Sequence, residues 1–493
     1  MAEEGGYLCP KMQDIAGSEE YSLKAQECHG MKEIISLLTF LYDDSYNCLI
    51  FDEPELHLHP QFQSFFLNEI RKVAGNPSVD PGKKLVFIIS HSPYFLDFRS
   101  IDDLKHVLVC HNHEKPTFVK DDDLDNQDEY VIKKFLPRFN THHKQFFFSP
   151  DPVFVEGYTD QQFISLLFEK TGMNIAASGA SVIDVGGKDE LAVFYKLCQI
   201  LHINCRIIAD YDALFRGKLR EYICSTDSIK QQFIKHGFGD NIANCIGNIE
   251  HSLSQIADQI EASTSKQADV KKIVDKLKDL YENKAANAET IKDVVLLSLY
   301  RYKEQIISEI PVISDDVNSV LAKHKNYLDC LKVAKIFIIP SGELEHFYKA
   351  EPVNYLNISR KDIAFAKEFE SILDTDDAVE LSQRYSDILP LLVESVPHIK
   401  VDLLEHIKYT MIDWIQTVQN AVNRREVTDV DSLRSSSRVN YAMYQQILEC
   451  RDDGFMLENN NNFTCHVFIK REFLGEEKEI VFSANTLPKE FVL

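Results

Sequence analysis

The sequence lacks the features that would place the chain in a membrane or outside the cell. It has no run of about 18 apolar residues, so no membrane span is expected. Its N-terminus is acidic and has no apolar core, which argues against a secretory signal. The eleven cysteines form no C-x-x-C pair, a pattern that favours reduced thiols over disulfides or a zinc site. We therefore expect an intracellular protein, cytoplasmic or nuclear and not secreted.

Positive charge is also scarce. Lys and Arg number 53 against 77 Asp and Glu, which gives a formal net charge of −24. This balance argues against a generally basic nucleic-acid-binding surface. It does not exclude a nuclease, because a site for divalent cations needs clustered carboxylates and the bound ions then present positive charge to a phosphate. The length of 493 residues suggests about three domains.

The first block, residues 1–120, alternates strand and helix signals. The short apolar runs "CLIFD" and "KLVFIIS" are typical of buried parallel strands, and "HPQFQSFFLNEIRKVAG" between them has the pattern of a crossover helix. The acidic stretch "DDDLDNQDEY" follows. We expect it to belong to a solvated linker over residues 121–150.

The second block, residues 151–350, repeats the alternation with "PVFVEG", "SVIDVGG", "CRIIADYD" and "AKIFIIPSG" as strands. A stretch of helical spacing at about 225–330 interrupts it and predicts a helical insertion. Residues 351–493 predict a mostly helical extension with a short β tail. The fold class is therefore α/β, with parallel sheets as the organising feature.

Four carboxylates stand where predicted strands end. Glu156 closes one strand and Asp160 lies on the first turn of the next helix, while Asp210 and Asp212 follow another strand. In an open parallel sheet, ligands bind outside the carboxyl ends of the strands. Hard oxygen ligands suit Mg²⁺ or Mn²⁺, and two such ions can clamp the attacking and leaving oxygens of a phosphodiester.

The ordered motifs "VEGYTD", "VIDVGGKDEL" and "IIADYDAL" resemble the Toprim domain, in particular that of the overcoming-lysogenization-defect (OLD) nucleases. Topoisomerase Toprim domains usually carry a third acid where Leu214 stands here, which favours the OLD family. The resemblance implies a metal-dependent nuclease that cleaves DNA. It also implies that "SGELEHFY" supplies ligands to a second metal through Glu343 and Glu345, and that a downstream basic residue, for which we take Lys361, takes part in catalysis.

The front block resembles part of the ABC-type ATPase that precedes the Toprim domain in OLD proteins. In "LIFDEPELHLHP", Asp52 would bind Mg²⁺ and Glu53 would orient the hydrolytic water, and in "FIISHSPYFLD" His91 would sense the γ-phosphate. No G-x-x-x-x-G-K-[ST] phosphate loop occurs in the sequence. The resemblance therefore covers only the C-terminal lobe of the ATPase, and we expect ATP to bind only if other sequence supplies that loop.

Several alternatives stay open. Lys188 would contact a phosphate or lie on the surface at a helix start, and Arg216, Lys218 and Arg220 would contact DNA or form a solvated basic turn. Two interpretations of function compete. The first is a two-metal DNA endonuclease, expected as a homodimer with no membrane partner. The second is a degenerate or truncated ATPase/Toprim protein that mediates interactions without ATP turnover.

Overall fold

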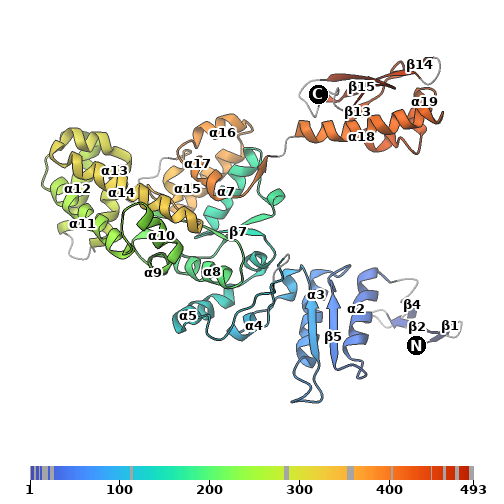
Figure 1. Cartoon of the computed structure of the whole chain (residues 1–493), viewed down its shortest axis with the longest axis horizontal. Helices are drawn as coiled ribbons and strands as arrows, with labels where there is room; N and C mark the ends of the chain where they lie inside the picture. Colours follow the sequence, from blue (N-terminus) through green and yellow to red (C-terminus); the bar gives the residue numbers. More distant parts are fainter. Residues whose placement is uncertain are drawn as a thin grey trace. The chain divides into compact units, whose positions relative to one another are not determined.

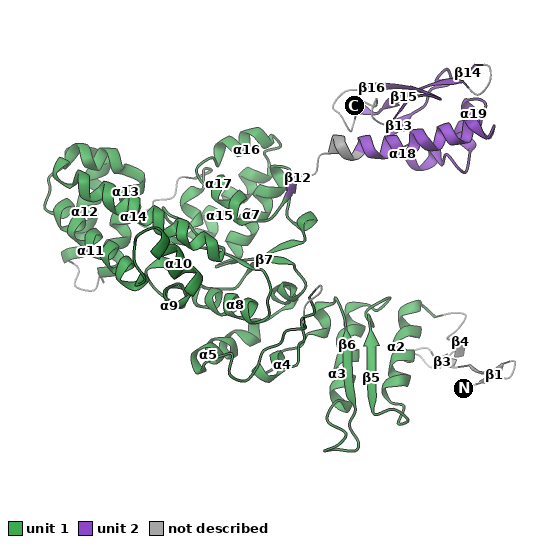
Figure 2. Cartoon of the chain, in the orientation of Figure 1, with its two compact units in different colours: residues 1–398 green, residues 399–493 purple. Residues whose placement is uncertain are grey.

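The computed structural model describes most of the chain and divides it into two compact units, residues 1–398 and 399–493 (Figure 2). The described backbone covers residues 2–4, 7–9, 11–13, 20–22, 27–111, 115–282, 288–351, 360–400, 403–445, 447–458, 462–471 and 477–487. Side chains are described from residue 27 onward, except 403–406. Within these ranges, no helix has the length and apolar character needed to cross a bilayer.

The N-terminal part of unit 1 contains the predicted βαβ pattern, labelled in Figure 1. Strands β5 (Cys48–Asp52) and β6 (Leu85–Ile89) pair in parallel, and α3 (Pro60–Val73) connects them. Helix α2 (His29–Leu41) packs beside α3. The shared core of this ATPase-like segment includes Phe51 and Phe66. The short strands β1 (Ala2–Glu4), β2 (Tyr7–Cys9), β3 (Lys11–Gln13) and β4 (Glu20–Ser22) precede it.

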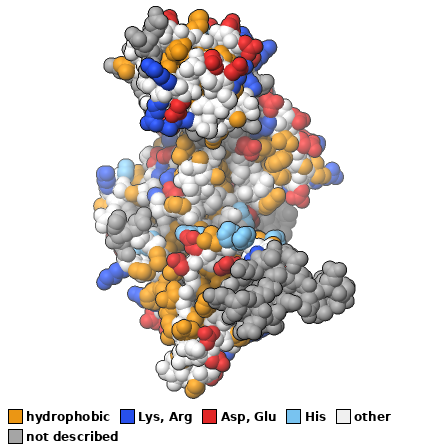
Figure 3. Space-filling view, turned by 90° about the vertical axis from the view of Figure 1, so that its right-hand side faces the viewer, with side chains coloured by type: hydrophobic (Ala, Val, Ile, Leu, Met, Phe, Trp, Pro, Cys, Tyr) orange, Lys and Arg blue, Asp and Glu red, His pale blue; other side chains and the backbone are white. Residues whose placement is uncertain are grey.

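The two-stranded sheet of this segment is buried on one face only. Side chains alternate across a strand, so every second residue points away from the helices. Those residues include Ile50, 67% exposed, and Phe87, 49% exposed, together with Leu85 and Ile89. Apolar side chains are correspondingly visible on the lower part of the space-filling view (Figure 3). A parallel sheet normally has both faces covered, so this one is unusual.

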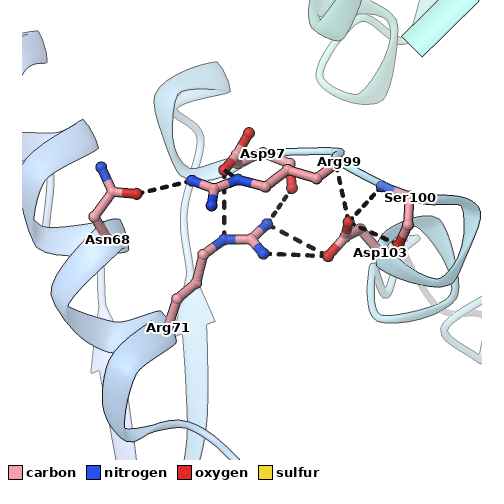
Figure 4. A network of polar contacts seen from close by, with 6 residues as sticks. All are labelled: Asn68, Arg71, Asp97, Arg99, Ser100 and Asp103. Carbon is pink, nitrogen blue, oxygen red and sulfur yellow. Dashed lines mark hydrogen bonds and ion pairs between the residues drawn. The ribbon is translucent and has the colours of Figure 1, made fainter. Parts of the chain in front are cut away.

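A polar network ties the segment to the turn that follows β6 (Figure 4). Arg71 on α3 pairs with Asp97 and Asp103, and Arg99 reaches Asn68 with a hydrogen bond of 2.9 Å. Asp103 also accepts the Ser100 N–H at 2.8 Å, which closes a capping box at the start of α4 (Ile101–Lys105). The network fixes the path of the chain as it leaves the sheet.

The second sheet has four parallel strands in the order β11-β10-β7-β9. These are β7 (Asp151–Val155), β9 (Ala180–Asp184), β10 (Arg206–Ala209) and β11 (Ile336–Ile338). Helix α7 (Tyr158–Lys170) follows β7, and α8 (Lys188–Ile200) follows β9. Both faces are buried: Phe154 and Ile207 belong to one core, and Val153 and Ile208 to the other. This confirms the predicted α/β class.

The predicted acidic linker at 121–150 is wrong as a description of its structure. Residues Asn126–Phe135 form α5 and Thr141–Lys144 form α6. Val131, Ile132 and Phe135 are buried and join the core on one face of the four-stranded sheet. Asp125 and Asp128 cap α5, whereas Asp121 and Asp122 lie in the exposed turn before it, so only the first few residues of the predicted linker are solvated.

The helices expected at about 225–330 lie between β10 and β11. They follow α9 (Lys218–Ser225) and are α10 (Asp227–Lys235), α11 (Ile242–Glu261), α12 (Ala268–Glu282), α13 (Ala288–Glu309) and α14 (Ser314–Leu331). After β11, the helices α15 (Lys361–Leu373), α16 (Ala378–Arg384) and α17 (Leu389–Ser395) contribute to the core on the other face of the sheet. The remaining strand of this region is β8 (Met173–Asn174).

Unit 2 begins with β12 (Ile399–Lys400) and consists mainly of one long helix and an antiparallel sheet. Its helices are α18 (Leu403–Asn423), α19 (Val430–Ser435) and α20 (Tyr441–Tyr444), and its sheet strands are β13 (Leu448–Glu449), β14 (Phe455–Leu457), β15 (Phe463–Ile469) and β16 (Lys478–Ser483). Along β15 buried and part-exposed residues alternate, and Phe463 and Val467 pack in the same core as Trp414 of α18. The β portion is larger than the short tail that the sequence suggested.

Candidate metal site and ATPase-like segment

The carboxylates that follow the strands of the four-stranded sheet meet at its carboxyl edge. Glu156 comes directly after β7, and Asp210 comes directly after the neighbouring strand β10. The backbone N–H of Asp210 donates to Glu156 Oε1 at 3.3 Å. The parallel pairing of β7 and β10 therefore brings together two of the predicted site residues from different motifs.

Asp160 joins them from the first turn of α7. Its Oδ2 accepts the N–H of Gly157 at 2.9 Å, so the carboxylate satisfies a backbone donor at the start of the helix while it lies beside the other acids. Loss of solvent raises the pKa of Asp160 to about 7, with the charge of Glu345 adding to the shift. Asp160 thus links the strand-end acids to the "SGELEHFY" segment.

The same two causes act on the strand-end acids. Loss of solvent raises the pKa of Glu156 to about 7, and the charge of Asp212 contributes. Loss of solvent also raises the pKa of Asp210 well above its usual range, with Glu156 and Asp160 contributing. Carboxylates that raise one another's pKa values form an electrostatically strained cluster, which a cation would relieve.

Asp212 is held by two basic side chains. Lys188 Nζ lies 2.8 Å from its Oδ2, and Arg216 Nε lies 2.9 Å from the same oxygen. Lys188 starts α8 after a tight Gly-Gly turn in which Gly186 has φ +80°, a conformation that favours glycine. Lys188 thus pairs with a site carboxylate instead of standing free on the surface.

Arg216 connects Asp212 to the helical insertion. Its guanidinium also pairs with Asp293 on α13, and with Glu289 at 3.3 Å. Arg220 pairs with Glu250 at 3.4 Å and Lys218 with Asp128 at 3.6 Å. The predicted basic turn is therefore paired with acids rather than solvated. The Arg216–Asp293 pair could not be predicted from local patterns, because its partners lie far apart in the chain.

The segment after β11 contributes a third group of site residues. Glu343 caps the short helix η8 (Leu344–Phe347), which carries the buried Glu345. Gly342 precedes it with φ +137°, and a Cβ there would lie 2.2 Å from His346 Nδ1, so only glycine fits. Lys361 Nζ lies 2.5 Å from Glu343 Oε2 and 3.3 Å from Glu345 Oε1. The structure therefore places Lys361 beside the two glutamates.

The charged form of the Lys361 side chain is stabilised by its neighbours. Burial alone would lower the pKa of Lys361, but the hydrogen bond to Glu343 and the charge of Glu345 reverse this and raise it above its usual range. The charges of Lys188 and Lys361 thus neutralise part of the carboxylate cluster.

Glu368 on α15 supports the segment that carries Glu343 and Glu345. Its carboxylate is fully buried and accepts the backbone N–H groups of Lys349 and Ala350 at 2.7–2.9 Å, together with the hydroxyl of Tyr385. These bonds fix the chain directly after η8. The sequence analysis did not identify Glu368, because a lone acid inside an amphipathic helix looks like a surface residue.

The donor set fits divalent cations, although the described residues contain no ready-made group of three His, Cys, Asp or Glu side chains converging on one point. All six acids, Glu156, Asp160, Asp210, Asp212, Glu343 and Glu345, offer hard oxygens, which suit Mg²⁺ or Mn²⁺. Lys188 pairs with Asp212 and Lys361 pairs with Glu343, two of the acids that would hold a cation. Cation binding would therefore require both ammonium groups to move aside.

The ATPase-like segment has its own acids at strand ends, and they are exposed. Asp52 ends β5, and Glu53 follows it with φ +46°. His91 follows β6 nearby, with its Nε2 3.8 Å from Glu53 Oε1. The structure thus brings Asp52, Glu53 and His91 to one edge of the two-stranded sheet. Neither this edge nor any other stretch of the sequence supplies the glycine-rich loop that would cradle phosphates.

Comparisons with known proteins find matches both for the region of the carboxylate cluster and for the ATPase-like segment. Residues 147–212 match the model of the Toprim domain of overcoming lysogenization defect protein-like proteins. The chain contains an OLD-like Toprim domain. Residues 11–96 match the AAA ATPase domain model. The OLD-like Toprim match covers three strands of the four-stranded sheet and four of the six acids, so the resemblance inferred from the motifs is confirmed.

Two curated relatives match over part of their length. An OLD nuclease of Thermus scotoductus is 27% identical over 166 residues, which cover 33% of this chain and 30% of that protein. The endonuclease GajA of Bacillus cereus is 23% identical over 186 residues, which cover 35% of this chain and 27% of that protein. The alignments thus span less than a third of either relative.

Among solved structures, the C-terminal region of the Burkholderia pseudomallei OLD protein matches with 16% sequence identity and a TM-score of 0.15. The match covers 46% of this chain and 99% of that one.

Proposed function

We propose that this protein is a divalent-cation-dependent DNA endonuclease whose active site is the carboxylate cluster of its OLD-like Toprim domain. The observation that carries the proposal is the meeting of acids from three separate segments at one sheet edge. There, Glu156 and Asp160 have pKa values raised to about 7 by loss of solvent and by neighbouring acids. Acids that repel one another contribute little to stability. They suit the binding of cations, which would in turn bind a phosphodiester.

Each group has a proposed role. The six acids would hold two cations of Mg²⁺ or Mn²⁺, which when bound supply Lewis acidity and an activated water. Glu156 and Asp160 would release their protons as the cations enter, because the positive charge favours the carboxylate form. Lys361, freed from Glu343 and Glu345, would then be available to stabilise charge on the phosphate.

The proposal is tested by plasmid nicking with Mn²⁺ or Mg²⁺ and the full chain. Asp210→Asn removes a charge from the centre of the cluster, and we expect it to reduce the nicking rate by about 100-fold or more. Asp52→Asn is the matched control, because Asp52 also ends a parallel strand but lies in the ATPase-like segment. Nicking that is equal in wild type and Asp210→Asn, or that persists in excess chelator, would contradict the proposal.

A second function is favoured for the ATPase-like segment by its exposed sheet face and its lack of a phosphate loop. We propose that this segment mediates interactions, including formation of a homodimer, and does not turn over ATP in this chain alone. We expect calorimetry with MgATP to show no binding in the micromolar range. The sequence has no glycine-rich loop whose backbone N–H groups would bind the phosphates of ATP. Micromolar binding that Asp52→Asn abolishes would restore the segment as a nucleotide site.

A further inference from the structure

Tyr348 is a buried polar residue next to the carboxylate cluster, and the proposed function does not use it. It follows η8 directly and is only 3% exposed. In the part of the chain that the structure describes, its hydroxyl has no hydrogen-bond partner. A buried hydroxyl without a partner costs free energy, so such groups are uncommon and call for an explanation.

The hydroxyl lies beside the acids of the site. The pKa of Tyr348 is raised by loss of solvent and then by the charges of Glu345, Asp160, Glu368 and Asp210. Glu368 already accepts two backbone N–H groups and the Tyr385 hydroxyl. The other three acids belong to the carboxylate cluster. The Tyr348 N–H bonds the Glu345 carbonyl and its ring contacts Phe163, one turn after Asp160 on α7, so the residue lies next to that site.

The Tyr348 hydroxyl makes no hydrogen bond to Asp160 or Glu345. Asp160 accepts the N–H of Gly157, and Glu345 is paired with Lys361. Both constraints would change if the carboxylates turned toward a shared cation and Lys361 moved away. The hydroxyl would then find an acceptor that it lacks now.

Neighbouring rings hold the Tyr348 side chain in place, so its hydroxyl cannot easily turn toward a different acceptor. It packs against Phe163 of α7, with ring centroids 5.4 Å apart, and against Phe365 of α15 at 6.4 Å. Its backbone N–H donates to the Glu345 carbonyl at 3.3 Å, and the Glu368 carboxylate fixes the next two residues. The donor is therefore held in place before any ligand arrives.

We propose that Tyr348 is a positioning residue of the metal site, whose hydroxyl donates a hydrogen bond to the Asp160–Glu345 carboxylate pair when these acids bind a divalent cation. Carboxylates that bind metals are commonly oriented by a hydrogen bond from a second residue, and loss of that bond weakens binding by about 10–100-fold. The inference rests on the proposed function, because it requires a cation at this site.

The test is Tyr348→Phe, which keeps the ring and removes only the hydroxyl. Binding of Mn²⁺ to the full chain is measured from the electron paramagnetic resonance signal of the free ion, and the melting temperature is measured without metal. We expect affinity to fall by about 10-fold or more. The metal-free melting temperature should stay equal or rise, because the hydroxyl has no partner to lose.

Tyr195→Phe is the matched control. Tyr195 is a buried tyrosine of α8 whose hydroxyl donates to the Ala334 carbonyl, so its removal should lower the melting temperature and leave Mn²⁺ affinity unchanged. Unchanged affinity in Tyr348→Phe, or a lower metal-free melting temperature, would overturn the positioning role alone. Absence of Mn²⁺ binding by the wild type would overturn the proposed metal site itself.

Discussion

The two parallel sheets of unit 1 differ in how completely they are covered. The four-stranded sheet has a core on each face, and its strand-end acids are partly or fully buried beside one another. The two-stranded sheet has one covered face, and its strand-end residues Asp52 and Glu53 are exposed. Similar local sequences, an apolar run followed by acids, thus produce two different chemical environments. Burial among other acids, rather than position at a strand end, separates a reactive cluster from a solvated one.

The largest expected difference between the two sheets is in catalysis. Glu156→Gln and Glu53→Gln are matched, since each removes one glutamate charge just after a parallel strand. We expect Glu156→Gln to reduce Mn²⁺-dependent nicking by about 100-fold or more, because it removes a proposed metal ligand. Glu53→Gln should change the rate by less than about twofold in the same assay. Equal losses in the two variants would show that the sheets act as one site.

The next difference is in stability. Ile208 and Ile50 are isoleucines in parallel strands, 4% and 67% exposed respectively. We expect Ile208→Ala to lower the free energy of unfolding by about 3 kcal/mol, because it leaves a cavity between sheet and helices. Ile50→Ala should lower it by no more than about 0.5 kcal/mol. Urea unfolding followed by circular dichroism measures both, and a large loss in Ile50→Ala would mean that another surface covers this face.

A smaller effect is expected in the pH dependence of stability. The raised pKa values of Glu156 and Asp160, about 7, lie above the unfolded values of about 4. Between these values the folded, metal-free protein binds more protons than the unfolded chain, so its stability falls as the pH rises from about 4 to 7. We expect a drop of a few degrees in melting temperature over this window. Scanning fluorimetry at pH 5 and pH 7.5 measures it.

The control for this effect uses the other sheet. Glu156→Gln should reduce the decline in melting temperature, and Mn²⁺ should remove it, because a bound cation favours the ionised acids. Asp52→Asn should leave the decline unchanged. A melting temperature that rises with pH in the metal-free wild type would contradict the raised pKa values.

The sequence predicted the elements that local patterns encode. Apolar runs identified β5, β6, β7 and β10, and strand ends identified Glu156, Asp210 and Asp212. The acids near residue 121 concealed α5, because its apolar residues Val131, Ile132 and Phe135 are few and follow a charged stretch. Its apolar face could be recognised only with the sheet that it covers.

Interactions between distant segments could not be predicted from one sequence. The pairing of Lys188 with Asp212 and of Arg216 with Asp293 joins segments that are far apart in the chain. Tyr348 was missed for a similar reason, since a tyrosine within "EHFY" resembles an ordinary core residue. Its lack of a hydrogen-bond partner is a property of the assembled core, and no local pattern reports it.

The register between β10 and β11 has a consequence for how the protein folds. Ala209 pairs with Ile338 although the whole helical insertion lies between them in sequence, and this pairing brings Asp210 to the segment that carries Glu345. Closing so long a loop is slow, whereas contacts within the insertion are local and fast to form. The insertion should therefore acquire structure before the two strands meet. Under the proposed function, metal affinity would then appear only in the final folding step, and Mn²⁺ binding would report complete folding.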